Sequence, residues 1–211
     1  MFSDIIMKKL VILIEGSKTK TFPFLKSLQK RFYDYYGIDI KNSDWCKVLQ
    51  NYLLENNIET KIFKWNGRIS SSSILNASKT LAEFIDRLAE RCDEITIFSK
   101  SLGGIVAAKS VGFCLKKDRI RKIIFVATPH RNKKLLLPTH TRIINVYSPD
   151  DKYLHLANNV LNLGLGSIRI INARNIPLNN VRHSEFNKNI LIKCNNRKIR
   201  LFHFYKDIIT N

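Results

Sequence analysis

A series of short apolar runs, four to eight residues long and rich in β-branched residues, constrains the fold most strongly. Each run is followed by polar residues, glycine or proline. The runs are near-continuous instead of alternating, which is typical of strands buried on both faces of a sheet. They are Leu10–Ile14, Thr60–Trp65, Ile95–Phe98, Ile120–Ala127, Ile143–Tyr147 and Ile168–Ile171. The pattern predicts a buried sheet of about six strands.

Segments with helical periodicity separate most of these runs. In one of them Leu81, Phe84, Ile85 and Leu88 form an apolar stripe at the spacing of one helix face. The predicted helices are Ile74–Arg91, Ser101–Leu115, Tyr153–Leu161 and Ile199–Ile209. Strands that alternate with helices predict the α/β class, with a mostly parallel sheet covered by helices on both faces.

The length of 211 residues fits one large domain, and neither a linker nor an internal repeat divides it. We therefore expect a single domain over residues 1–211. The aromatic-rich segment Phe22–Asn57 is long for one crossover. It is predicted to hold two helices around Gly37, with partial cover of the active site as a further hypothesis. The run Ser70–Ser73 predicts a loop that ends in a helix N-cap.

The four cysteines, Cys46, Cys92, Cys114 and Cys194, lie far apart and form no metal-binding spacing with one another or with histidine. They predict reduced thiols, with no metal and no organic cofactor. The apolar run near the N-terminus is too short for a signal peptide, and none approaches a transmembrane span. The expected location is cytoplasmic.

One strand runs directly into a turn and then into a small-residue helix, at Ile95–Ala108. The turn carries Ser101, with small residues two positions before and after it, Ser99 and Gly103. A turn this tight needs small flanking residues, because larger side chains collide with the strand and the helix. It would hold the Ser101 hydroxyl clear of the sheet at the positive end of a helix. The backbone N–H of Leu102 would then point to where an oxyanion forms.

Residues Ser101-Leu102-Gly103-Gly104 closely resemble the nucleophile turn of the α/β-hydrolase superfamily, in particular small lipase-like and esterase-like members. The first glycine of the G-x-S-x-G pattern is replaced by Ser99, and the histidine often found before the nucleophile is Lys100. The resemblance implies a minimal α/β-hydrolase fold and extends over about residues 8–190. A phosphate-binding turn is the alternative, but its glycine spacing and its Lys-Ser/Thr pair are missing.

The order Ser…Asp…His downstream strengthens this interpretation. Asp150 and Asp151 follow a predicted strand on the same edge of the sheet as Ser101, and His183 lies in a loop after the last predicted strand. The segment His183–Phe186 also resembles the histidine segment of lipase-like hydrolases. The superfamily pattern favours Asp151 as the acid, and Asp150 remains the alternative.

The oxyanion hole needs a second backbone N–H, from the loop after the first strand. The superfamily commonly has His-Gly there, whereas this chain has Glu15-Gly16-Ser17. The resemblance therefore implies Leu102 together with Gly16 or Ser17 as donors. The predicted function is a serine hydrolase acting on a small-molecule or lipid ester, or a thioester. The alternative is a binding protein of the same fold that has lost catalysis.

The chain has 36 Lys+Arg against 17 Asp+Glu, a formal net charge of +19. This excess raises the hypothesis of nucleic acid, an anionic membrane surface or an acidic protein as a partner. No aromatic-plus-basic motif supports nucleic acid. The basic runs are Lys116–Lys122, predicted on the edge opposite the active site, Arg131–Lys134, predicted on the active-site edge, and Lys193–Lys206. We expect solvated loops for most of this charge and attraction to lipid headgroups or an acidic partner for the rest.

Overall fold

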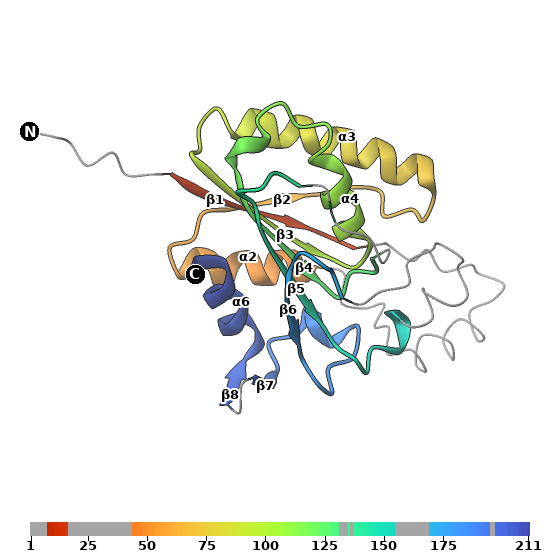
Figure 1. The fold of residues 1–211 in the computed structure, drawn as a ribbon. Coiled ribbons are helices and arrows are strands. Elements are labelled where there is room, and N and C mark those ends of the chain that lie inside the picture. The colour runs from red at the N-terminus through yellow and green to blue at the C-terminus, as the bar shows by residue number, and fades with distance from the viewer. Residues whose placement is uncertain (1–7, 17–43, 131–134, 136, 155–168, 195–196) are drawn as a thin grey trace, which may run out of the picture.

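The computed structural model describes residues 8–16, 44–130, 135, 137–154, 169–194 and 197–211 (Figure 1). Within these residues six strands form one sheet in the order β2-β1-β3-β4-β5-β6, and every neighbouring pair is parallel. The strands are β1 (Lys9–Ile14), β2 (Thr60–Phe63), β3 (Glu94–Lys100), β4 (Ile120–Val126), β5 (Arg142–Tyr147) and β6 (Arg174–Pro177). The predicted parallel sheet is confirmed.

Helices cover both faces of the sheet, as predicted (Figure 1). On one face lie α3 (Ser71–Leu88) and α4 (Leu102–Ser110). On the other face lie α2 (Trp45–Glu55) and α6 (Leu201–Thr210). Among the described helices, none is long and apolar enough to cross a membrane.

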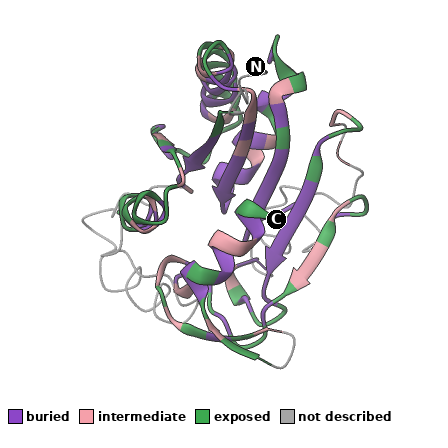
Figure 2. Cartoon of the chain, turned by 90° about the vertical axis from the view of Figure 1, so that its left-hand side faces the viewer, coloured by how far each residue is buried: buried purple, intermediate pink, exposed green. Residues whose placement is uncertain are grey.

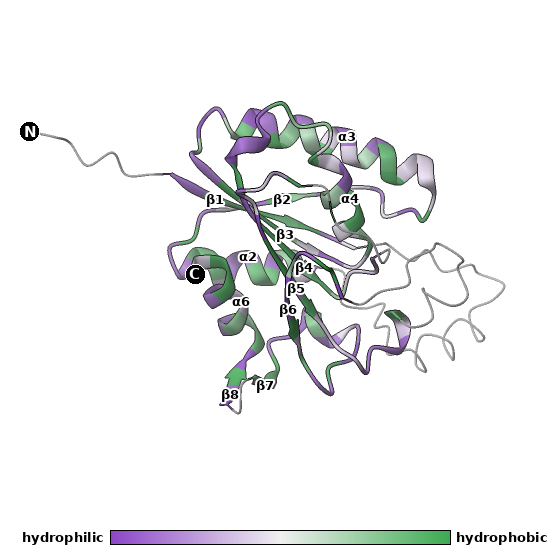
Figure 3. Ribbon diagram, viewed as in Figure 1, coloured by the Kyte–Doolittle hydropathy of each residue, from purple (hydrophilic) through white to green (hydrophobic). Residues whose placement is uncertain are grey.

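The alternation of side chains along β1 shows why the strands read as continuous apolar runs. Leu10, Ile12 and Ile14 pack with the cluster beneath α3 and α4, whereas Val11 and Leu13 pack with the cluster beneath α2 and α6. All five side chains are almost completely buried. Burial of each contributes roughly 2 kcal/mol. The central strands are accordingly buried in Figure 2 and hydrophobic in Figure 3.

The predicted strand at Ile168–Ile171 is wrong. The last strand of the sheet is β6 (Arg174–Pro177), and residues 169–171 lie outside any strand, with Ile171 exposed. Because β6 is an edge strand with a single neighbour, it needs no continuous apolar run and it tolerates proline. Ile170 is buried without joining the ladder, since its N–H and C=O bond to the side chain of Asn175 at 3.0 and 2.8 Å.

The predicted C-terminal helix begins two residues too early. Residues 199 and 200 belong to β8 (Arg197–Arg200), which pairs antiparallel with β7 (Leu191–Cys194). The helix predicted to end at Leu115 ends at Ser110. Most of the predicted helix Tyr153–Leu161 lies outside the described residues.

The predicted N-cap of α3 is confirmed: Ser70 is extended, and its hydroxyl accepts a hydrogen bond from the Ser73 N–H at 3.2 Å. Of the segment Phe22–Asn57, the structure describes the part that contains α2, whereas residues 17–43 lie outside the described residues. The expectation of a helix before Gly37 and of partial cover over the active site falls on the latter part.

Candidate active site

The carboxyl ends of four adjacent strands meet at one edge of the sheet. The register pairs Ile14 of β1 with Ser99 of β3, and Lys100 of β3 with Val126 of β4. Val126 in turn pairs with Val146 of β5. The segments that follow these strands therefore emerge side by side, as parallel strands require. They carry Gly16, Ser101 and the pair Asp150–Asp151.

Ser101 lies in the turn between β3 and α4, in a strained backbone conformation with φ 51° and ψ −132°. A positive φ in a residue other than glycine costs of the order of 1–3 kcal/mol, which the surrounding packing must offset. The Ser101 N–H donates to the Val126 carbonyl at 2.9 Å, and the Gly104 N–H donates to the Ser101 carbonyl at 2.9 Å. These bonds tie the turn to β4 and to the first turn of α4.

The residues that flank Ser101 show why small side chains are needed here. A β-carbon on Gly103 would lie 2.3 Å from the Glu15 carbonyl oxygen, and one on Gly104 would lie 2.3 Å from Thr128. Ser99, which replaces the usual glycine, is fully buried, and its hydroxyl donates to the Ile124 carbonyl at 3.2 Å. A serine therefore fits this position, because its one polar atom finds a partner in β4.

The segment after β1 lies against the nucleophile turn. A β-carbon on Gly16 would lie 3.0 Å from Ser101 Cβ and 3.6 Å from Ser101 Oγ. The preceding carbonyl, that of Glu15, accepts a hydrogen bond from Trp65 Nε1 at 2.8 Å. Leu102 is the first residue of α4, so its N–H has no acceptor within the helix. Of the three predicted oxyanion donors, Leu102 and Gly16 thus lie beside Ser101, and Ser17 lies outside the described residues.

Asp151 and His183 form a buried hydrogen-bonded pair. His183 Nδ1 lies 2.8 Å from Asp151 Oδ2, and the two residues are 6% and 0% exposed. The other carboxylate oxygen, Oδ1, accepts hydrogen bonds from the N–H groups of Tyr153 and Leu154 at 3.0 and 3.1 Å. These bonds fix the carboxylate, and the carboxylate in turn orients the imidazole.

Asp150 forms different contacts from Asp151. It is exposed, and its Oδ2 accepts a hydrogen bond from the Asn180 N–H at 2.8 Å, which joins the acid loop to the histidine loop. The histidine loop is also held from α6, because Tyr205 donates its hydroxyl proton to the Phe186 carbonyl at 3.0 Å. Within the described residues, the imidazole is bonded to Asp151 and not to Asp150.

Lys100, which stands where the superfamily often has a histidine, is a buried cation beside this pair. It is 6% exposed. Burial lowers the pKa of Lys100 to about 8, against the opposing effect of the Asp151 carboxylate. Burial also lowers the pKa of His183, Asp151 opposes this effect, and the charge of Lys100 adds to it. The one signal in the sequence for this burial is the position of Lys100, two residues after the apolar part of a buried strand.

The geometry of the serine and the histidine differs from a fully assembled triad. Within the described residues no hydrogen bond joins Ser101 Oγ to His183, although both side chains are buried at the same edge of the sheet. Catalytic hydrogen bonds are often long in unliganded enzymes and tighten when substrate binds. The ring of Tyr153 lies against His183, with centroids 4.5 Å apart, and limits the tilt of the imidazole.

The other described histidines and the cysteines form no bond with Ser101, His183 or Asp151 within the described residues. His130 is buried against Phe125, and burial lowers the pKa of His130 to about 3. His203 is an exposed residue of α6, 3.7 Å from Asp207. The described residues contain no cluster of three or more His, Cys, Asp or Glu that could hold a metal ion. The thiols of Cys92, Cys114 and Cys194 are free, and Cys46, Cys92 and Cys114 are buried.

The fold of the chain is similar to that of known proteins. No protein-family profile and no curated protein matches the chain. Among solved structures, an inferred hydrolase of the α/β superfamily from Xanthomonas campestris has 12% identity and a TM-score of 0.52, over 95% of this chain and 98% of that one.

Two further structures agree with this match. An inferred CIB-like hydrolase from Thermoplasma acidophilum has 14% identity and a TM-score of 0.52, over 95% of this chain and 84% of that one. An inferred thioesterase from a Silicibacter species has 11% identity and a TM-score of 0.53, over 82% of this chain and 68% of that one. The strand order and the structural matches together show that the chain has the α/β-hydrolase fold.

Proposed function

We propose that the protein is a serine hydrolase that cleaves carboxylic esters or thioesters through an acyl-enzyme on Ser101. The observation that carries the proposal is the buried Asp151–His183 pair, at the edge of the sheet where the strained turn presents Ser101. Burying a carboxylate beside an imidazole costs free energy of desolvation, so fold stability alone does not explain this pair. A positioned base and a serine on a strained turn are what nucleophilic catalysis needs.

In the first half of the reaction, Ser101 Oγ attacks the acyl carbonyl carbon and its proton passes to His183 Nε2. Asp151 accepts a hydrogen bond from Nδ1 of the imidazole, which leaves Nε2 without a proton and able to act as the base. The N–H groups of Leu102 and Gly16 stabilise the oxyanion, each by roughly 3 kcal/mol. The C–O or C–S bond then breaks, and the leaving group takes the proton from His183.

In the second half, water attacks the acyl-enzyme while His183 accepts its proton. The tetrahedral intermediate collapses, the carboxylic acid departs, and Ser101 recovers the proton from His183. The scheme needs no redox step. The lowered pKa of His183 supports it, because the imidazole must be neutral to accept a proton at neutral pH.

A fluorophosphonate probe tests the proposal directly, because it phosphonylates an activated serine. We expect one equivalent of label on the folded wild type, none on Ser101→Ala, and full labelling of the control Ser72→Ala, an exposed position of α3. Turnover of p-nitrophenyl esters and acyl thioesters of increasing chain length then identifies the acyl group. Labelling without turnover of either class would direct the search to amides.

The alternative is a binding protein that keeps the fold without catalysis. The absence of a Ser101–His183 hydrogen bond within the described residues favours this alternative. If the folded wild type does not label, while near-ultraviolet circular dichroism shows intact packing, the hydrolase proposal is wrong and the binding protein stands.

A further inference from the structure

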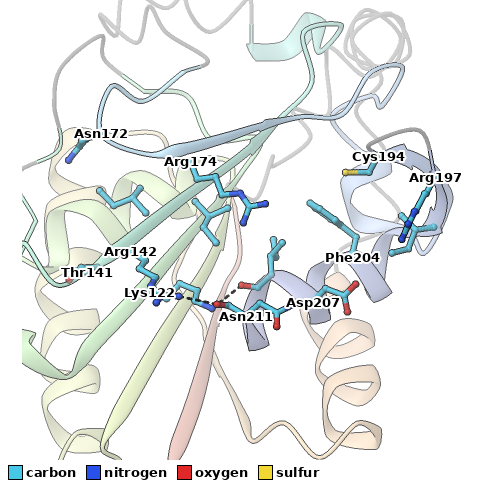
Figure 4. A pocket seen from close by; sticks show the side chains of 14 residues that line it. Lys122, Thr141, Arg142, Asn172, Arg174, Cys194, Arg197, Phe204, Asp207 and Asn211 are labelled. Carbon is cyan, nitrogen blue, oxygen red and sulfur yellow. Dashed lines mark hydrogen bonds between the residues drawn. The ribbon is translucent and has the colours of Figure 1, made fainter.

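A cavity of about 730 Å³, shown in Figure 4, lies at the edge of the sheet opposite the one that carries Ser101. It is lined by residues at the amino ends of β4, β5 and β6, together with residues of α6 and of the β7–β8 hairpin. The parallel strands carry the catalytic segments at their carboxyl ends. This cavity is therefore separate from the candidate active site.

Cationic side chains dominate the polar lining of this cavity. Lys122, Arg142, Arg174 and Arg197 contribute four cationic side chains, and Asp207 contributes the one acidic side chain. The cations come from four different strands, so it is the tertiary structure that gathers them around one cavity. Asp207 itself lies 3.7 Å from His203 Nε2.

Two of these cations form hydrogen bonds with carbonyl groups at the C-terminal end of α6. Lys122 Nζ donates to the carbonyls of Ile208 and Ile209 at 3.0 and 2.8 Å, and Arg142 Nη1 donates to the Asn211 carbonyl at 3.0 Å. Helix C-termini leave such carbonyls without intrahelical donors, and cations are favourable there. Lys122 is buried and is therefore not one of the solvated residues expected of the Lys116–Lys122 run.

The other two cations do not bind the end of α6 within the described residues. Arg174 and Arg197 are exposed, and in the part of the chain that the structure describes neither side chain forms an ion pair or a hydrogen bond. Some other exposed cations of the basic surface are paired: Arg119 Nη1 lies 3.4 Å from Asp93, and Lys116 Nζ lies 3.9 Å from Glu90. Unpaired guanidinium groups on a cavity wall are available to an anion.

The cavity also has an apolar floor. Ile143, Ile144, Ile199 and Ile208 line it, and Phe204 lies between Arg174 and the Cys194–Arg197 side of the hairpin (Figure 4). Guanidinium groups match phosphate oxygens in charge and in bidentate geometry. An apolar surface beside them favours a ligand with a hydrocarbon or aromatic body instead of a free inorganic ion.

We propose that this cavity binds an organic phosphate monoester, with its phosphate on the unpaired guanidinium group of Arg174 or Arg197 and its apolar body against Phe204 and the isoleucines. The same chemistry is offered by a free phosphorylated metabolite and by the headgroup of an anionic phospholipid such as phosphatidate. The proposal is independent of the hydrolase function, because a phosphate monoester offers no acyl carbonyl to Ser101.

Isothermal titration with n-octyl phosphate tests the proposal on the full chain. The test variant is Arg174→Gln/Arg197→Gln, and the matched control is Arg87→Gln/Arg91→Gln, which removes the same charge from exposed positions at the end of α3. We expect octyl phosphate to bind the wild type and the control equally, and the test variant at least tenfold more weakly. Octyl glucoside and inorganic phosphate are both expected to bind at least tenfold more weakly than octyl phosphate.

Several results would overturn the proposal. Equal weakening in both double variants would mean that net charge, and not this cavity, attracts the ligand. Failure of the folded wild type to bind octyl phosphate would exclude the site, and equal affinity for inorganic phosphate would exclude the apolar part.

Co-sedimentation with phosphatidylcholine vesicles, with and without phosphatidate, distinguishes the two sources. Binding to phosphatidate vesicles that is lost in the test variant supports the lipid headgroup as the source. Octyl phosphate binding without vesicle binding supports the soluble phosphomonoester.

Discussion

The α-carbon of Gly103 faces the carbonyl oxygen of Glu15 so closely that a β-carbon on Gly103 would lie 2.3 Å from that oxygen. This contact packs the first turn of α4 directly onto the end of β1. It places the Glu15–Gly16 segment beside Ser101, which is where a second oxyanion donor is needed. The glycine two positions after the nucleophile therefore serves the site by permitting this backbone approach.

Gly103→Ala is expected to destabilise the protein and reduce activity, because backbone atoms cannot move away from the added methyl group as a flexible side chain can. We expect a loss of about 2–4 kcal/mol in the free energy of unfolding. Urea denaturation followed by tryptophan fluorescence measures it. The control is Gly112→Ala, where the nearest atom to the added carbon is 3.5 Å away. Equal effects of the two substitutions would contradict the packing argument.

The two adjacent aspartates are expected to differ sharply in their effect on catalysis. Asp151→Asn is expected to lower kcat/KM by roughly 10³–10⁴-fold, because the amide no longer stabilises the imidazolium that forms during turnover. Asp150→Asn keeps an oxygen that can accept a hydrogen bond from the Asn180 N–H. We therefore expect kcat/KM to fall less than fivefold. Steady-state kinetics on the best ester substrate compares them. A larger loss in Asp150→Asn would assign the acid to Asp150.

The pH dependence of kcat/KM reports the pKa of His183 in the free enzyme. Burial lowers this pKa, Asp151 opposes the shift, and Lys100 adds to it. Because the general base must be neutral, we expect the acid limb of the profile below pH 6.5, the ordinary value for histidine. Loss of the Lys100 charge, whose pKa is about 8, adds an inflection on the alkaline side.

Lys100→Met separates the contribution of the lysine from that of burial. Removing the positive charge favours the imidazolium, so the acid limb is expected to move to higher pH and the inflection near pH 8 to disappear. Lys109→Met, an exposed position on α4, makes the same change in net charge and is expected to leave the profile unchanged. Identical profiles for wild type and Lys100→Met would show that the lysine has no influence on His183.

Trp65 is expected to support the site from a distance. Its indole N–H donates to the Glu15 carbonyl at 2.8 Å, and the residue is 8% exposed. Trp65→Phe keeps much of the apolar packing and removes this donor. We expect the free energy of unfolding to fall by about 1–2 kcal/mol, since the buried carbonyl loses its partner. We also expect kcat to fall more than KM changes, because Gly16 is less firmly placed beside Ser101. Unchanged kinetics would show that the Glu15–Gly16 segment is held without the tryptophan.

The sequence by itself determined the α/β class, the central buried strands and the position of the nucleophile turn. These are local properties: Leu10–Ile14 and Ile143–Tyr147 read as apolar because both faces of each strand are buried, and Ser99-Lys100-Ser101 is recognisable by the small residues that a tight turn demands. The edge strand β6 escaped prediction because one neighbour and partial exposure impose no apolar pattern on Arg174–Pro177.

The superfamily pattern favours Asp151 but leaves Asp150 as the alternative, and only the tertiary structure shows which aspartate bonds to the histidine, because the two side chains point in different directions. The loop after β6 brings His183 to 2.8 Å from Asp151, whereas Asp150 meets the backbone of Asn180. Tertiary packing also buried Lys100 beside that pair and gathered Lys122, Arg142, Arg174 and Arg197 around one cavity. Contacts between residues so far apart in the sequence depend on how loops and strand ends pack, and no local sequence pattern encodes them.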